Sequence, residues 1–286
     1  MTWQPGRTAP DIAMIFVQIS DLHLRADGPL KGVVDSQAAL DACVDHIGNL
    51  SPRPDFAIAT GDLVQKAAKR DFDGLRRRLN RLGMPVYVIP GNHDDRDLLR
   101  DAFADTDYMP ADGFIQYAID DYPLRLIALD TADPGRDGGK ICAQRLQWLD
   151  RTLAARGQAP TLIFMHHPPF RTGISFMDED AFIGAEELQA VIEKHPQVER
   201  IICGHMHRDI VTSFAGRVAS VAPSIVFQMV LDLNPGAPSG FVLEPPALPL
   251  FLWEGKDKGG LIGHMSVIGD FGRRHSFAAD KKSIRQ

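Results

Sequence analysis

The chain has 286 residues, of which 44% are hydrophobic and 24% charged, the composition of a globular protein with ample material for a core. With 31 basic and 37 acidic side chains the formal net charge is −6, which argues against broad nucleic-acid or membrane-surface binding. The three cysteines, Cys43, Cys142 and Cys203, are an odd number and lie far apart, so we expect reduced thiols and no disulfide framework.

The N-terminal region shows no targeting signal, because its apolar run at residues 14–17 is too short for a signal-peptide core or a membrane span. Together with the cysteine usage, this predicts a cytoplasmic protein. No internal linker rich in Gly, Ser or charge appears, so we place one domain over residues 14–270. Residues 1–13 and 272–286 are expected to be flexible termini.

The first predicted strand, residues 14–19, ends just before Asp21 and His23. An Asp and a His two positions apart beyond a strand can share one cation. A helix cap by Asp21 with a surface His23 explains the pair equally well when it is taken alone.

The second predicted strand repeats this arrangement. It covers residues 55–60, follows a helix over 34–50, and ends in Gly61 and Asp62. A capping role would explain one such carboxylate. Because the sequence of a strand, a turn and an Asp occurs twice, we favour Asp62 as a metal ligand.

The third predicted strand covers residues 86–89 and ends at Pro90, which cannot continue a ladder. Gly91 then frees the backbone to turn and delivers Asn92, His93 and Asp94. Ligands bind at the carboxyl ends of strands in open α/β sheets, so this stretch is a candidate site. The arginine-rich helix predicted over 71–82 is interpreted as a solvated surface.

Two runs, 114–120 and 124–130, are separated by a turn signal and predict an antiparallel pair. This pair departs from pure βαβ alternation and favours a layered α/β fold with two sheets. Further helices are predicted over 97–103, 143–156 and 186–195.

Two more buried strands end in histidines. The strand over 161–165 ends at His166, and the strand over 198–203 ends before His205 and His207.

Between these strands, residues 171–184 are predicted to form a lid loop that hangs near the site. Phe176, Met177 and Asp178 of this loop are candidate substrate-binding residues, and the alternative is a surface loop whose apolar side chains pack onto the core.

After Arg208 the pattern changes to short strands and prolines, which we expect to complete the second sheet. Residues 228–256 are predicted to form a cap or oligomerisation element. Apolar side chains predicted to be exposed there indicate a homo-oligomer, a dimer or higher; they are Phe241, Leu248, Leu250 and Phe251.

Five strand ends thus supply seven candidate metal ligands: Asp21, His23, Asp62, Asn92, His166, His205 and His207. A nitrogen and oxygen set without thiolate suits Mn, Fe, Zn or Co. Seven donors are too many for one tetrahedral ion but fit two ions that share a carboxylate. Pairs of this kind, about 3.5–4 Å apart, activate water for attack at phosphorus.

The order D-x-H, G-D, G-N-H-D, H and G-H-x-H over positions 20–207 resembles the calcineurin-like metallophosphoesterase superfamily. Within it, the chain looks most like class III cyclic-nucleotide phosphodiesterases and bacterial glycerophosphodiesterases. The resemblance implies a four-layer αββα sandwich of two mixed β-sheets flanked by helices. It also implies a phosphodiesterase that cleaves small diesters through a hydroxide bridging two divalent ions.

The resemblance assigns a role to each motif residue. The first metal would be held by Asp21, His23 and His207. The second metal would be held by Asn92, His166 and His205. Asp62 would bridge the two ions, while His93 and Asn92 would contact the substrate, with His93 as the catalytic proton donor or charge stabiliser. His167, Asp94 and Asp130 are expected to support the ligands or the fold.

One departure bears on the substrate, because Leu63-Val64-Gln65-Lys66 stands where phosphoprotein phosphatases of the superfamily carry an Arg. This argues against phosphoprotein hydrolysis, and Gln65 leaves the fine substrate preference open. The alternatives are a nuclease or a phosphomonoesterase of the same superfamily, or a scaffold without catalysis. A nuclease should show a basic groove and a scaffold should lack ligands, and the sequence shows neither. We expect no stable nucleic-acid or membrane partner.

Overall fold

The structure, a computed structural model, describes residues 14–272 and residue 275. The predicted flexible termini, 1–13 and 272–286, therefore fall almost entirely outside the described residues. In the described part, no helix is long and apolar enough to cross a membrane.

The first sheet has five strands in the order β13-β12-β1-β2-β3. The strands β1, β2 and β3 are parallel, β12 pairs antiparallel with β1, and β13 pairs antiparallel with β12. Their bounds are Met14–Ile19 (β1), Phe56–Thr60 (β2), Val86–Ile89 (β3), Ala247–Trp253 (β12) and Leu261–Val267 (β13).

The second sheet has six strands in the order β4-β5-β6-β7-β9-β8, and its four central strands are parallel. The predicted antiparallel pair is confirmed as β4 and β5. The bounds are Tyr117–Ile119 (β4), Arg125–Leu129 (β5), Thr161–Met165 (β6), Val198–Cys203 (β7), Ile210–Phe214 (β8) and Arg217–Val221 (β9).

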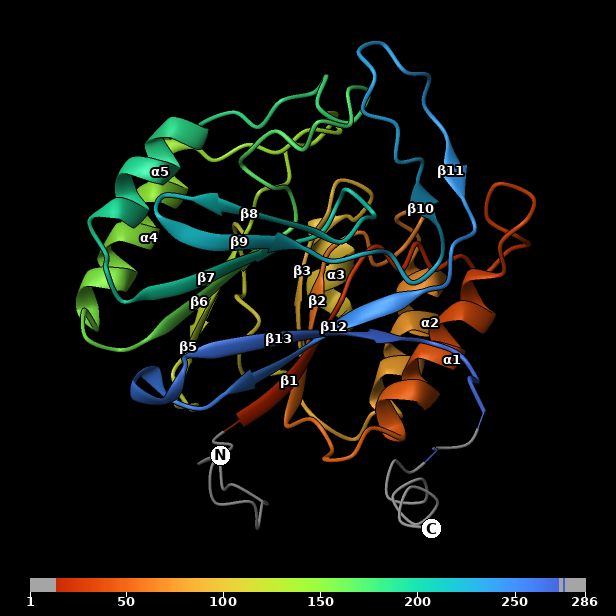
Figure 1. Cartoon of the computed structure of the whole chain (residues 1–286), viewed down its shortest axis with the longest axis horizontal. Coiled ribbons are helices and arrows are strands. Elements are labelled where there is room, and N and C mark those ends of the chain that lie inside the picture. Colours follow the sequence, from red (N-terminus) through yellow and green to blue (C-terminus); the bar gives the residue numbers. More distant parts are fainter. Residues whose placement is uncertain (1–13, 273–274, 276–286) are drawn as a thin grey trace, which may run out of the picture.

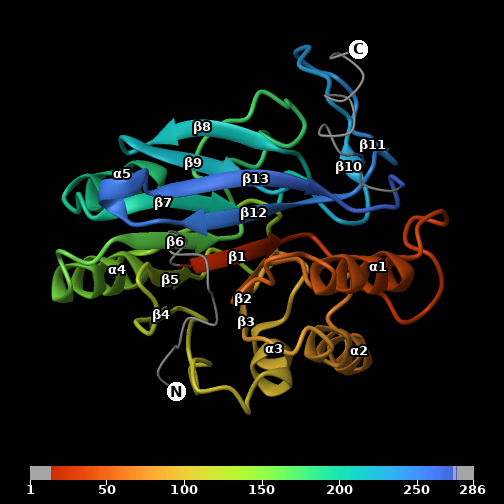
Figure 2. The same ribbon diagram turned by 60° about the horizontal axis from the view of Figure 1, so that its bottom comes forward.

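Within residues 14–272, five α-helices flank the two sheets, with α1 and α2 at one end of Figure 1, α4 and α5 at the other, and the sheets between them. Figure 2 shows α3 on the same side as α1 and α2. The predicted fold, two mixed sheets flanked by helices, is therefore confirmed. The helices are Ser36–Gly48 (α1), Lys69–Asn80 (α2), Arg96–Ala102 (α3), Ala143–Ala155 (α4) and Ala185–Glu193 (α5).

The parallel strands are buried on both faces, because each sheet is covered by helices on one side and by the other sheet on the other side. All six residues of β1 and all five of β6 are buried. Gln18 is the polar exception in β1, and its Nε2 donates to Thr60 Oγ1 at 3.0 Å and to the Cys203 carbonyl at 2.7 Å. This side chain ties the two sheets together just beneath the strand ends.

The prediction for the C-terminal strands was partly wrong. β8 and β9 complete the second sheet, but β12 and β13 join the first sheet beside β1. Leu248 and Phe251 lie on opposite faces of β12, which sits between β1 and β13, and both are buried, at 0% and 2% exposed. These two residues are therefore not available for an oligomer contact.

A small ribbon of two strands, β10 (Gln228–Met229) and β11 (Phe241–Val242), stands apart from both sheets. We call residues 228–243 the arm, and it rises beside the lid at the same end of the molecule (Figure 1). The two segments touch, because Ser175 Oγ of the lid donates to the Asn234 carbonyl of the arm at 3.3 Å.

Candidate metal centre

The candidate ligands converge because β1, β2 and β3 of one sheet and β6 and β7 of the other point their carboxyl ends at one edge. Seven non-glycine residues of the described chain have positive φ, and five of them are candidate ligands: Asp21, His23, Asp62, His205 and His207. Such a backbone costs about 1–3 kcal/mol per residue and persists where the surroundings fix it. The strain is thus concentrated at the candidate site.

Three glycines precede ligands, but only Gly61 has the positive φ (86°) that a turn glycine provides. Gly91 and Gly204 are needed for space. A Cβ on Gly91 would lie 2.1 Å from Asp62 Oδ1, and a Cβ on Gly204 would lie 2.0 Å from Ser20 Oγ. The expectation that Gly91 serves conformational freedom is therefore corrected, since close approach of the backbone to a ligand explains it.

The first group of donors comes from the first sheet and the turn after β7. One ligand atom of each of its members lies within 4.8 Å of the others: Asp21, His23, Asp62 and His207. His23 Nε2 lies 3.0 Å from His207 Nε2, and His207 Nε2 lies 3.4 Å from Asp21 Oδ1. Their side chains are buried, so these donors face one another without bulk water.

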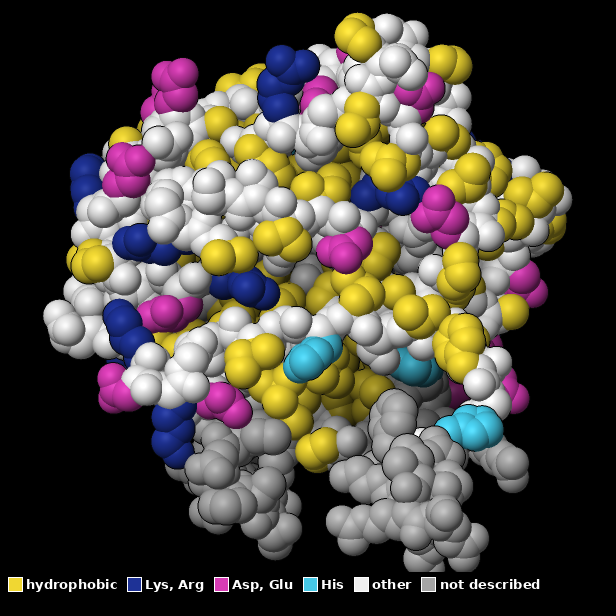
Figure 3. Space-filling view, in the orientation of Figure 1, with side chains coloured by type: hydrophobic (Ala, Val, Ile, Leu, Met, Phe, Trp, Pro, Cys, Tyr) yellow, Lys and Arg dark blue, Asp and Glu magenta, His cyan; other side chains and the backbone are white. Residues whose placement is uncertain are grey.

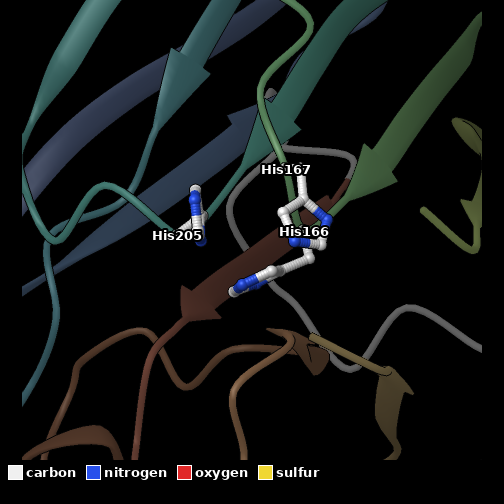
Figure 4. A group of neighbouring side chains, drawn as sticks. All are labelled: His166, His167 and His205. Carbon is white, nitrogen blue, oxygen red and sulfur yellow. The ribbon is translucent and has the colours of Figure 1, made fainter. Parts of the chain in front are cut away.

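The second group is built on β6, β7 and the turn after β3. His166 Nε2 lies 3.2 Å from Asn92 Oδ1, and the rings of His166 and His205 are 5.2 Å apart. Figure 4 shows His166 and His167 at the end of β6 and His205 at the end of the neighbouring β7.

Asp62 lies between the two groups. Its Oδ2 is 3.7 Å from His23 Nε2, and its Oδ1 is 3.4 Å from His166 Nε2. One carboxylate therefore presents one oxygen to each group, which is the arrangement a shared ligand requires.

The hydrogen bonds of two imidazoles fix which ring nitrogen carries the lone pair. His207 Nδ1 lies 3.0 Å from the Phe227 carbonyl and His166 Nδ1 lies 2.7 Å from the Thr60 carbonyl, so each Nδ1–H donates to a carbonyl. In the neutral form of these rings, each Nε2 carries a lone pair that faces other acceptors. A cation bound between these acceptors would explain why they face one another. The residues therefore fit a pair of metal ions.

Burial keeps most of the imidazoles neutral, the form that binds metal. Desolvation lowers the pKa of His23 and of His205 to about 3 and that of His207 to about 4. His166 differs, because the charge of Asp62 and its hydrogen bond outweigh burial and raise the pKa of His166 to about 9. Burial would raise the pKa of Asp62, but the charges of His166 and His23 hold it well below its usual value.

His93 lies at the edge of the centre, with 34% of its side chain exposed and its Nε2 4.0 Å from Asp62 Oδ2. Its Nδ1 lies 3.2 Å from the carbonyl of Gln65, so the ring donates there and turns Nε2 toward the cavity. Gln65 therefore contacts His93 Nδ1 with its backbone carbonyl and also with its side-chain Nε2, at 3.3 Å.

A cavity of about 650 Å³ opens over both groups, and the lid residues Phe176 and Met177 line it. Asp178 has a different surrounding: its carboxylate accepts hydrogen bonds from the backbone and hydroxyl of Thr172 and from the backbone of Gly173. These bonds hold the lid in shape, so we do not assign Asp178 to substrate.

The three residues expected to support the site do so in different ways. Asp94 accepts hydrogen bonds from the backbone of Leu63, Val64 and Gly91, and so fixes the turns that carry Asp62 and Asn92. Asp130, directly after β5, pairs with Arg96 Nε at 2.7 Å. His167 Nδ1 lies 2.9 Å from Thr131 Oγ1, and its ring packs against that of His205.

Sequence reasoning missed two residues beyond β9. Ser224 Oγ donates to the Asp21 carbonyl at 2.8 Å, and the Phe227 carbonyl fixes His207. β9 is parallel to β7, so its end reaches the same edge. A sixth buried strand end was the available signal, but it carries no carboxylate or imidazole.

A buried group of carboxylates and imidazoles and a second, partly exposed group of imidazoles with an amide lie at one edge of a four-layer sandwich. This arrangement defines a protein with a centre suited to a pair of divalent metals. The sequence matches the calcineurin-like phosphoesterase family over residues 14–209. The chain belongs to this family, as its motifs predict.

Known proteins resemble the chain over most of its length. A "Probable glycerophosphodiester phosphodiesterase GpdQ" of Arcobacter nitrofigilis is 36% identical over 273 residues, which cover 95% of this chain and 99% of that protein. The 3',5'-cyclic adenosine monophosphate phosphodiesterase CpdA of Escherichia coli (strain K12) is 30% identical over 217 residues, 74% of this chain and 76% of that protein. A dimetal phosphatase from Danio rerio shares the fold, with a TM-score of 0.61 at 16% identity, covering 91% of this chain and 100% of that one.

Proposed function

We propose that the chain is a metal-dependent phosphodiesterase that hydrolyses small phosphodiesters. The observation that carries the proposal is Asp62, which presents one oxygen to each of the two donor groups. The names of two relatives, a glycerophosphodiester phosphodiesterase and a cyclic AMP phosphodiesterase, support the reaction class. Glycerophosphodiesters and cyclic nucleotides are the substrate classes we propose.

Two divalent ions fit the donor set, and Mn, Fe, Zn and Co are the candidates because no thiolate takes part. One ion would be held by Asp21, His23 and His207. The other ion would be held by Asn92, His166 and His205. Asp62 would be a ligand of both ions. When bound, such a pair supplies positive charge at the phosphate oxygens and an acidified water.

The side chains around the centre carry the remaining steps. His93 Nε2, turned toward the cavity by the Gln65 carbonyl, donates a proton or positive charge to the departing alkoxide. Asn92 has its Oδ1 directed at the second donor group, so its Nδ2 remains to donate to a phosphate oxygen. Phe176 and Met177 cover the organic part of the substrate and exclude water.

The charge of the cavity favours a diester over a monoester. Leu63 and Val64 follow Asp62 and are fully buried, so no Arg stands there to pair with a dianionic phosphate. Among the described residues that line the cavity, Lys31 is the single Lys or Arg. A diester carries one negative charge and therefore needs fewer cationic partners than a dianionic monoester.

The test is turnover of a small panel by protein loaded with Mn²⁺. We expect hydrolysis of glycerophosphodiesters, cyclic nucleotides and bis(p-nitrophenyl) phosphate, with p-nitrophenyl phosphate much slower. Hydrolysis of the monoester alone, or of long nucleic acid alone, would replace this proposal with one of the alternatives.

The arm is the surface we propose for contact between copies of the chain. Leu231, Leu233 and Leu243 are each more than 60% exposed, and Figure 3 shows hydrophobic side chains gathered over this part of the molecule. The solution mass measured by light scattering tests this. We expect the wild type to form a dimer or a higher oligomer, and Leu231→Ser to weaken this association. A monomeric wild type would reject the proposed contact.

A further inference from the structure

Gln18 is a buried amide near the end of the apolar strand β1, and no step of the reaction uses it. Its side chain is fully buried, and its Nε2 donates to Thr60 Oγ1 at 3.0 Å and to the Cys203 carbonyl at 2.7 Å. Because a carbonyl can only accept, the amide nitrogen must face Cys203. Its Oε1 has no hydrogen-bond partner among the residues that the structure describes.

Core stability does not explain this amide. A buried oxygen without a partner costs free energy, and an apolar side chain of similar length would avoid that cost. The two acceptors do not need Gln18 either. The Cys203 carbonyl also accepts from the Ala222 backbone at 2.9 Å, and Thr60 Oγ1 donates to the Ile19 carbonyl at 3.5 Å. What Gln18 adds is a pair of directed N–H donors, so its role lies in what those donors hold in place.

Both partners of Gln18 are connected to metal-ligand positions of the second group. The carbonyl of Thr60 accepts from His166 Nδ1–H at 2.7 Å. Cys203 is the last residue of β7, two positions before His205. Since β7 belongs to the second sheet while β1 and β2 belong to the first, Gln18 joins the two sheets directly beneath these ligands.

The second group depends on how the two sheets are aligned at this edge. Asn92 follows β3 of the first sheet, whereas His166 and His205 follow β6 and β7 of the second. Asp62, from the first sheet, must also reach across to His166, and its Oδ1 lies 3.4 Å from His166 Nε2. Bonds between a metal and its ligands vary by only about 0.2 Å, so a small displacement of one sheet against the other would weaken this group.

The first group has supports of its own. Asp21 accepts from Ser20 Oγ through its carboxylate and from Ser224 Oγ through its carbonyl. The Phe227 carbonyl orients His207. Loss of the Gln18 contacts should therefore affect the two groups unequally.

We propose that Gln18 is a positioning residue that keeps His166 and His205 aligned with Asp62, so that the second metal ion can bind. Gln18 contacts neither the ligand side chains nor the cavity, and it acts through the strand ends of β2 and β7. This inference rests on the proposed two-metal phosphodiesterase and adds a residue to its metal centre.

The test replaces Gln18 by Met, which keeps the length of the side chain and removes both donors. Gln197→Met is the matched control, because Gln197 is also buried and its Nε2 donates to the Leu153 carbonyl at 3.1 Å. Gln197 directly precedes β7, so it lies at the end of that strand opposite to His205. Mn²⁺ binding to metal-free protein is measured by calorimetry and by electron paramagnetic resonance, and thermal unfolding verifies that each variant is folded.

We expect Gln18→Met to bind one Mn²⁺ with wild-type affinity and the other roughly 10- to 100-fold more weakly. When Mn²⁺ is supplied at about two ions per chain, the resonance spectrum of this variant should show isolated Mn²⁺, whereas the wild type should show a spin-coupled pair. Gln197→Met should match the wild type in both measurements.

A Gln18→Met protein that binds both ions as tightly as the wild type would overturn the inference, and so would equal weakening in Gln197→Met. If Gln18→Met does not fold, Thr60→Val supplies the same readout. It removes the hydroxyl that accepts from Gln18 and keeps the carbonyl that accepts from His166, so wild-type affinity for both ions in this variant would also overturn the inference. A wild type that binds only one ion would instead refute the proposed two-metal centre itself.

Discussion

Replacing Gly204 by Ala tests whether the metal centre depends on close backbone packing. The added Cβ would lie 2.0 Å from Ser20 Oγ, 2.8 Å from the Thr60 carbonyl and 3.0 Å from Asp21 Oδ2. Side-chain rotation alone cannot relieve this, because the Thr60 contact is to backbone. To reach a contact distance of about 3.5 Å, Ser20 Oγ must move by about 1.5 Å and the Thr60 carbonyl by about 0.7 Å.

Overpacking of this kind costs about 1–3 kcal/mol. For a chain of this size that corresponds to a fall in Tm of roughly 2–12 °C. The displacement also reaches the ligands, because Ser20 Oγ donates to Asp21 Oδ2 at 2.6 Å and the His205 backbone donates to the same carboxylate. Loss of such supporting contacts typically weakens metal binding by roughly 10- to 100-fold.

The assay is thermal unfolding of metal-free protein, followed by Mn²⁺ titration in a calorimeter. Gly48→Ala is the control, since Gly48 ends α1, has no atom within 4 Å of an added Cβ and does not have positive φ. We expect its Tm and Mn²⁺ affinity to be unchanged or slightly raised. A Gly204→Ala protein that melts and binds Mn²⁺ as the wild type does would refute the packing argument.

Three further predictions address the reaction. His93→Ala should keep both metals but slow turnover by roughly 10²- to 10⁴-fold, with a smaller loss for a nitrophenyl leaving group; loss of metal in this variant would reject the role. Phe176→Ala should raise KM for large diesters more than for small ones, measured across the substrate panel. An equal change in KM for all substrates would indicate that Phe176 only packs against the protein. Chelation should lower Tm by roughly 5–11 °C per site relative to metal at 100 times Kd, since binding then contributes about 2.7 kcal/mol; an unchanged melting curve would contradict a metal-stabilised core.

The parts of the site that local patterns encode could be predicted from the sequence. Buried strands such as β3 and β6 read as short β-branched and aromatic runs, and a polar residue directly after each run marks a strand end. Parallel strands bring those ends to one edge, so Asp62 and His166 were expected to meet, and they do at 3.4 Å.

The rest depended on contacts between distant segments. Nothing local indicates that β12 pairs with β1 across more than 200 residues, so Leu248 and Phe251 could not be recognised as core. The close approach of Gly204 to Ser20, and the carbonyl of Phe227 that orients His207, arise only when both sheets are assembled. The arm was expected to form a cap, but its contact with the lid needs the folded chain.

The most direct test of the central claim is a stepwise Mn²⁺ titration of metal-free protein, with metal content and hydrolysis of bis(p-nitrophenyl) phosphate measured at each step. Shared ligation by Asp62 predicts saturation at two ions per chain and full activity only as the second site fills. Asn92→Ala should then bind one ion tightly and lose most activity. Saturation at one ion with full activity, and no loss in Asn92→Ala, would contradict the account.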